Sequence, residues 1–158
     1  MILQVDVDGT IADTRELERL MLGGAISPGE YLRRAATEAE PIAPVVEWLQ
    51  HAAGLSIPIH YVTGRASHRH LRRLLHRLNV PPGIVWAAGP RVGALQHKVT
   101  TARALSHDGR SVHALDDNPD HLWALLQLPH LTGTRVPGWP LAERHQPITV
   151  SLPPLEKP

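Results

Sequence analysis

The apolar positions of the chain follow two spacings in turn, and together they predict alternating strands and helices. Short β-branched or apolar runs bounded by glycine or polar residues are typical of buried strands. Apolar residues three or four positions apart are typical of helices with one buried face. The predicted strands are 2–7, 57–63, 84–86, 111–115 and 131–136. The predicted helices are 15–22, 28–39, 44–54, 67–78, 97–105 and 119–128. This alternation favours an α/β fold with a parallel sheet covered on both faces.

The length of 158 residues favours one domain that is large enough to bury a core. The alternating pattern covers 1–136, which we interpret as this domain. The remaining residues, 137–158, are rich in proline, and we expect them to form an irregular or partly ordered tail.

Composition and charge exclude several classes of protein. The chain has no cysteine, so disulfides, thiolate metal sites and cysteine nucleophiles are all excluded. A net charge of +1 does not indicate a nucleic-acid binder. No leader-like segment precedes the first strand, and no apolar run approaches the roughly 20 residues of a membrane span. A cytoplasmic protein without membrane contact is therefore the expectation.

Polar side chains follow three of the predicted strands. Asp6 and Asp8 end the first strand and share one face of it, and two carboxylates that close need a cation or a shared proton. Thr63-Gly64-Arg65 ends the second strand and Asp116-Asp117 ends the fourth, while Lys98 lies near the start of the helix between them. The carboxyl ends of parallel strands meet at one edge of a sheet, so these groups should cluster there.

Each of these groups has a structural explanation when it is taken alone. A lone Asp-x-Asp is often a turn or a capping pair, Thr-Gly is a common strand exit, and Lys98 alone reads as a surface lysine. Asp116-Asp117-Asn118-Pro119 alone reads as a helix N-terminus capped by Asn118. It is their shared order and strand-end positions that indicate a site.

In this order the elements Asp6-Val7-Asp8-Gly9-Thr10, Thr63-Gly64-Arg65, Lys98 and Asp116-Asp117 resemble the motifs of the haloacid dehalogenase (HAD) superfamily of phosphotransferases. The resemblance covers about 2–136 and implies a Rossmann-like three-layer α/β/α sandwich with a mainly parallel sheet. It also implies a minimal helical cap, because 14–40 has room for only two short helices.

The resemblance implies a Mg²⁺-dependent phosphomonoester hydrolase, a HAD-type phosphatase. Asp6 would attack phosphorus to form an aspartyl-phosphate, and Asp8 would be the general acid and base. Thr63 and Lys98 would hold the phosphoryl oxygens. Mg²⁺ would be bound by the Asp6 carboxylate, the Asp8 carbonyl and Asp117. Asp116 would either be a further ligand or would hold one of the ligands in place. The expected substrate-binding residues are Gly9, Thr10, Gly64, Arg65 and Arg69. Relatives that dehalogenate need no acid at the position that corresponds to Asp8. The presence of Asp8 therefore makes dehalogenation a disfavoured activity.

The predicted helix 67–78 carries a basic face of arginine and histidine opposite its leucine stripe. A solvated polar face is the favoured interpretation, and a platform for a polyanion is the alternative. A small cap beside a basic helix is similar in layout to the phosphatase part of polynucleotide kinase/phosphatase proteins, although no kinase P-loop is present. The expected substrate is a nucleotide or other small phosphomonoester, or a phosphorylated nucleic-acid end. A HAD-like module that binds phosphate or nucleotide without catalysis is the competing hypothesis. The histidines show no zinc motif.

Overall fold

A five-stranded parallel sheet forms the centre of the computed structural model, which describes residues 1–65, 68–89, 91–137 and 150–155. The strand order is β5-β4-β1-β6-β7. The strands are β1 (Ile2–Val5), β4 (Ile59–Thr63), β5 (Ile84–Ala87), β6 (Val112–Asp116) and β7 (Leu131–Arg135). In the parallel register, Leu3 of the central strand lies between Ile59 and His113. The predicted α/β fold with a mainly parallel sheet is confirmed.

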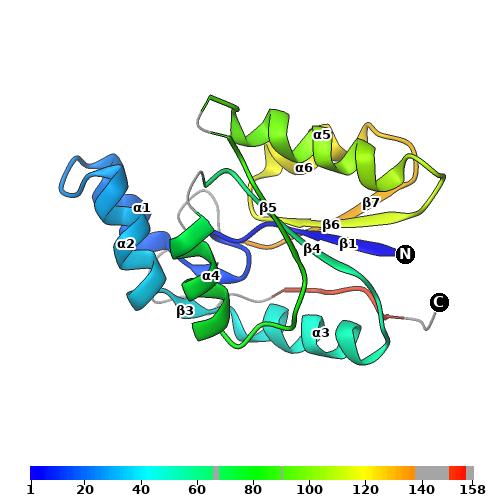
Figure 1. Ribbon diagram of the computed structural model, residues 1–158, viewed down its shortest axis with the longest axis horizontal. Coiled ribbons are helices and arrows are strands. Elements are labelled where there is room, and N and C mark those ends of the chain that lie inside the picture. The colour runs from blue at the N-terminus through cyan, green and yellow to red at the C-terminus, as the bar shows by residue number, and fades with distance from the viewer. Residues whose placement is uncertain (66–67, 90, 138–149, 156–158) are drawn as a thin grey trace.

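Helices cover both faces of this sheet, which gives three layers (Figure 1). On one face lie α5 (Ala94–Ser106) and α6 (Pro119–Leu126), and on the other lie α3 (Ala43–Gly54) and α4 (His68–Arg77). The leucine stripe of α4 is buried as its spacing predicts, with Leu71, Leu74 and Leu75 in the core. Asn118 caps α6 by accepting hydrogen bonds from the amides of Asp120 (2.9 Å) and His121 (3.3 Å).

Two short helices, α1 (Arg15–Leu22) and α2 (Pro28–Glu38), form the small cap at one end of the sheet (Figure 1). They have an apolar cluster of their own, made by Leu17, Ile26, Tyr31 and Ala35. The chain leaves the core at β2 (Ala12–Asp13) and returns at β3 (Glu40–Pro41), and these two strands pair antiparallel. The pairing brings both ends of the cap together at one point of the core.

The structure differs from the predicted boundaries in two places that affect the site. The first strand ends at Val5, because the chain turns back so that the Val7 carbonyl accepts hydrogen bonds from the amides of Ile11 and Ala12. Val7 is fully buried, so its apolar character made this loop look like strand. In addition, α5 begins at Ala94, one turn before the predicted start, which places Lys98 in its second turn.

Part of the C-terminal segment lies against the core without forming a helix or strand. Val150, Leu152 and Leu155 pack on the main apolar cluster, and the Trp48 indole of α3 donates a hydrogen bond to the Pro153 carbonyl at 2.8 Å. The predicted tail also includes 138–149 and 156–158, which lie outside the described residues. Among the helices of the described ranges, none is long and apolar enough to span a membrane.

Candidate active site

The carboxyl ends of three neighbouring strands supply most of the candidate site. Asp6 directly follows β1 and its amide donates to the Leu115 carbonyl at 2.9 Å, while Thr63 ends β4 and Asp116 ends β6. Two cavities of about 230 and 320 Å³ lie at this edge. Both are lined by a common set of side chains: Asp6, Asp8, Tyr31 and Lys98. The first also includes Asp117, and the second also includes Thr63, Gly64 and Arg65.

Lys98 is the cation at the centre of the site. Its ammonium lies 3.0 Å from Asp6 Oδ2 and 2.6 Å from Asp116 Oδ2, and its side chain is only 3% exposed. Burial lowers the pKa of Lys98, but the two carboxylates raise it by a larger amount. The net shift is upward, so the ammonium stays charged. Lys98 therefore provides a fixed positive charge between β1 and β6.

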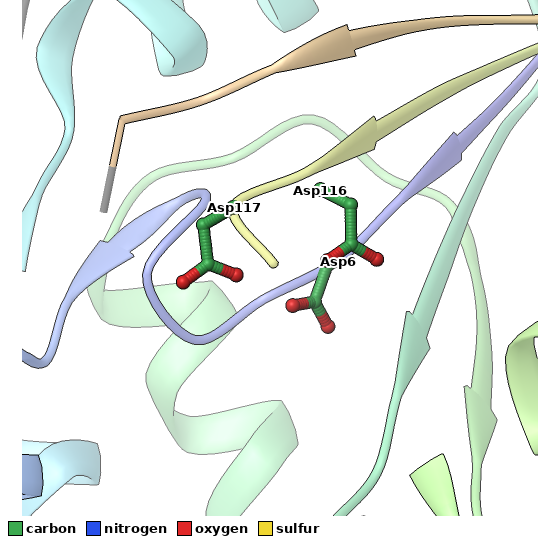
Figure 2. A group of neighbouring side chains, drawn as sticks. All are labelled: Asp6, Asp116 and Asp117. Atoms are coloured by element: carbon green, nitrogen blue, oxygen red, sulfur yellow. The ribbon is translucent and has the colours of Figure 1, made fainter. Parts of the chain in front are cut away.

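Three carboxylates converge around a point that can hold a cation. Asp6, Asp116 and Asp117 each place an oxygen within 4.8 Å of the others, and Figure 2 shows their side chains gathered at the ends of β1 and β6. Burial raises the pKa of Asp6 to about 7, against the opposing effect of Lys98, and the neighbouring carboxylates add to the rise. Burial and the charges of Asp6 and Asp116 raise the pKa of Asp117 to about 8. This part of the site holds more negative charge than its protein neighbours neutralise.

Asp116 differs from the other two carboxylates because both of its oxygens already accept hydrogen bonds within the protein. Oδ2 accepts from Lys98, and Oδ1 accepts from the Asn118 amide at 3.0 Å. The His121 ring lies 3.7 Å from Oδ1. Burial raises the pKa of Asp116, but His121 and Lys98 more than offset this and hold it below its usual range. Asp117 has no hydrogen-bond donor against it among the described residues, so it is better placed than Asp116 to bind a cation.

Asp8 is held by one side chain from the core and one from the cap. Arg65 donates from Nε to Asp8 Oδ2 at 2.6 Å and from Nη2 to Oδ1. The Tyr31 hydroxyl of α2 donates to Oδ1 at 3.0 Å, and the Arg65 guanidinium lies 5.6 Å from the centre of the Tyr31 ring. Burial lowers the pKa of Arg65, but Asp8 raises it by more, so the net shift is upward. The remaining nitrogen, Nη1, is buried without a partner within the described part of the chain.

The turn after Asp8 depends on Gly9. Its φ of +71° lies in the left-handed region, and a Cβ there would lie 2.6 Å from Asp117 Cγ. Thr10, the next residue, is fully buried and lines neither of the two cavities. Glycine thus lets the turn between β1 and β2 approach the Asp117 carboxylate.

The basic face of α4 is not part of either cavity wall. Arg69, Arg72 and Arg73 are exposed, and Arg72 lines a separate cavity beside Tyr61. Arg77, at the far end of α4, donates from Nε to the Ala36 carbonyl at 3.3 Å and from Nη2 to the Ala39 carbonyl. These bonds connect α4 to the C-terminal end of α2.

Sequence reasoning missed three polar residues of the site. Tyr31, which donates to Asp8, and Glu18, which lines the first cavity, come from the cap, and their spacing in the sequence contains no signal that they belong to the site. His121 had a signal, because it follows Asp116-Asp117 within the first turn of α6. Its Nδ1 lies 3.0 Å from the Lys98 ammonium, and its side chain lines the first cavity.

No family model and no curated protein sequence matches this chain. Among the solved structures that match its fold are two of the class C acid phosphatase from Bacillus anthracis. One has tungstate bound (TM-score 0.56, 16% identity, 73% of this chain and 51% of that one), and the other gives a TM-score of 0.58 at 17% identity over 76% and 52%. Another is the Pnkp1/Rnl/Hen1 RNA repair complex, with a TM-score of 0.64 and 15% identity over 85% of this chain and 42% of that one.

The chain therefore spans about half the length of the matched phosphatase chains and less of the third. At these identities the match concerns the fold. It confirms the predicted α/β fold with a mainly parallel sheet, which this chain shares with these structures.

Proposed function

We propose that this chain, which has the fold of HAD-type phosphatases, hydrolyses phosphomonoesters with the help of a bound Mg²⁺ and through an aspartyl-phosphate on Asp6. The observation that carries the proposal is the position of Asp6: a buried carboxylate, 3.0 Å from the Lys98 ammonium, in cavities that it shares with Asp8. The ammonium offsets the charge of Asp6 and so allows a phosphoryl dianion to approach it.

Two displacements at phosphorus complete the reaction. In the first, an Asp6 oxygen forms a bond to phosphorus while the bond to the leaving oxygen breaks, and Asp8 gives that oxygen its proton. In the second, water forms a bond to phosphorus and passes a proton to Asp8, and the bond to Asp6 breaks to release phosphate. Thr63 and Lys98, which line the second cavity, hold the phosphoryl oxygens. Arg65 and Tyr31 fix the position of the Asp8 carboxylate.

The carboxylates fit the Mg²⁺ that the fold family implies. Asp6 and Asp117 have raised pKa values because negative charge is buried there without sufficient compensation, and hard cations prefer such oxygens. The Asp8 carbonyl accepts no backbone hydrogen bond within the described residues, so it is available as a third ligand. Asp116, whose oxygens already accept hydrogen bonds from Lys98 and the Asn118 amide, would hold Lys98 in place and would not bind the cation directly. Bound there, the cation would neutralise phosphoryl charge.

Removal of the nucleophile tests the proposal. Asp6→Asn should abolish Mg²⁺-dependent release of phosphate from 4-nitrophenyl phosphate while the protein stays folded. Asp108→Asn, the same change at an exposed position in the loop before β6, is the matched control and should keep full activity. Activity retained in a purified Asp6→Asn protein would remove Asp6 from this role. A wild-type protein that binds phosphate but never releases it from an ester would favour the binding module instead.

A further inference from the structure

The cap supplies one part of the first cavity, and the core supplies the other. Glu18, Met21 and Leu22 come from α1 and Tyr31 comes from α2, whereas the remaining lining residues follow β1 and β6 or lie on α5 and α6. If the core groups hold the phosphoryl group, as the proposed function requires, then the cap side chains contact the rest of the substrate. This inference rests on the proposed function and concerns the leaving group.

The size and apolar surface of this cavity suit a compact, flat leaving group. A cavity of about 150 Å³ accommodates benzene, so 230 Å³ has room for a single ring beside a phosphoryl group. Leu22 is 64% exposed although it is a large apolar residue, and with Met21 it gives the cavity an apolar side. The Tyr31 ring adds an aromatic surface.

The charges around the cavity disfavour a leaving group that is itself an anion. Four carboxylates line it, those of Asp6, Asp8, Glu18 and Asp117. Its ammonium, Lys98, is already paired with two carboxylates. The His121 Nδ1 lies 3.0 Å from that ammonium, beside Asp116. Arg65, in the adjoining cavity, is paired with Asp8.

Glu18 is the carboxylate of this set that the proposed chemistry does not use. Its Oε1 accepts a hydrogen bond from the Thr14 hydroxyl at 2.6 Å, and it lies 3.4 Å from the Tyr31 hydroxyl, whose one hydrogen it shares with the nearer Asp8. These two neutral donors orient the carboxylate but leave its charge, and no ion pair joins Glu18 to a basic side chain within the described ranges. A carboxylate has about four acceptor positions, so Glu18 can accept further hydrogen bonds from a ligand in the cavity.

We propose that Glu18 selects substrates by the charge of the leaving group. The preferred substrates are small phosphomonoesters whose leaving group is apolar or aromatic and carries an ammonium or another hydrogen-bond donor. Leaving groups with additional negative charge, including a nucleic-acid strand, are disfavoured.

Two aryl phosphates of similar size test this proposal. 4-(Aminomethyl)phenyl phosphate carries a cation on its leaving group, and 4-(carboxymethyl)phenyl phosphate carries an anion. The measured quantity is the ratio of their kcat/KM values in the wild type divided by the same ratio in Glu18→Gln, because this division cancels the different reactivities of the two phenols. A hydrogen bond to a charged group should make the quotient about tenfold or more.

Glu30→Gln is the matched control, since it removes the same charge from the cap at a residue that lines neither cavity. A quotient below about twofold for Glu18→Gln, or an equal quotient for Glu30→Gln, would overturn the proposal. A 3′-phosphorylated oligonucleotide turned over faster than the cationic aryl phosphate would overturn it as well.

A measurement on the wild type keeps the test valid if Glu18→Gln does not fold. Product inhibition by 4-(aminomethyl)phenol should be about tenfold tighter than inhibition by 4-hydroxyphenylacetate. Equal inhibition would refute the role of Glu18. Turnover of 4-nitrophenyl phosphate in the same protein separates the two failures, because a loss of charge selectivity with normal turnover leaves the proposed function intact.

Discussion

Replacement of Gly9 by alanine should have two effects. It should destabilise the left-handed backbone of this turn, and its Cβ should displace the Asp117 side chain. Gly9 has a φ of +71°, and Gly109, in the loop before β6, has a φ of +73°. The two glycines differ in their surroundings, since a Cβ at Gly109 would meet nothing within 4 Å, whereas a Cβ at Gly9 would lie 2.6 Å from Asp117 Cγ. Gly109→Ala is therefore the control for the cost of the left-handed backbone alone.

The expected magnitudes follow from these distances. The left-handed conformation costs alanine about 1–2 kcal/mol, which lowers the Tm of a domain of this size by about 2–8 °C. Both variants carry this cost. Carbon atoms in contact lie about 3.5–4.0 Å apart, so in Gly9→Ala the Asp117 side chain must move by about 1 Å. Metal ligands tolerate only about 0.2 Å, so we expect Mg²⁺ affinity to fall by about 10–100-fold in Gly9→Ala.

The assay is a Mg²⁺ titration of 4-nitrophenyl phosphate hydrolysis, together with thermal unfolding with and without Mg²⁺. Gly9→Ala should need more Mg²⁺ for half-maximal activity and should gain less thermal stability from it, whereas Gly109→Ala should match the wild type in both respects. If the two variants have the same Mg²⁺ requirement, then Asp117 is not the ligand that we infer, or it does not lie against Gly9.

Three further predictions concern stability. Lys98→Met leaves two buried carboxylates without their cation and should lower the free energy of unfolding by about 3–5 kcal/mol; a loss below about 1 kcal/mol in urea denaturation would contradict the ion-pair geometry. Burial lowers the pKa of His113 from its ordinary 6.5, so the unfolded chain takes up the proton first and stability should fall as the pH drops below 6.5. Thermal unfolding between pH 7.5 and 5 should show this slope, and it should be smaller in His113→Gln. Trp48→Phe removes the hydrogen bond to Pro153 and should cost about 0.5–1.5 kcal/mol, with faster proteolysis of the C-terminal segment; unchanged proteolysis would mean that this bond does not hold the segment.

Much of the fold could be predicted because local patterns and global topology agree. The leucine stripe of α4 and the cap of α6 at Asn118 each rest on a few neighbouring residues, so sequence spacing contains their signal. The end of β1, in contrast, cannot be recognised from the spacing of neighbouring residues. Val5 and Val7 are equally apolar and equally buried, and what ends the strand is a set of hydrogen bonds from Ile11 and Ala12. Those bonds depend on the turn at Gly9 and not on the apolar pattern.

The candidate site also has one part that could be predicted from the sequence and one part that could not. Parallel strands bring Asp6, Thr63 and Asp116 to one edge by topology alone, so the order of elements was enough to predict their proximity. The contacts from the cap could not be predicted in this way. Tyr31 reaches Asp8 because α2 packs beside α4 with Arg77 between them, and helix-to-helix packing depends on side-chain shapes that a single sequence does not specify.

The antiparallel pairing of β2 with β3 makes the cap a detachable module. Ala12 lies opposite Pro41 and Asp13 lies opposite Glu40, so the chain leaves and rejoins the core at adjacent points. Any replacement segment with similarly close ends could be spliced there without stretching the sheet, because the cost of closing a loop grows only slowly with its length. The carboxylates of Asp6 and Asp117 stay in the core, so under the proposed function a library of transplanted segments would alter substrate choice while the same core residues carry out the hydrolysis.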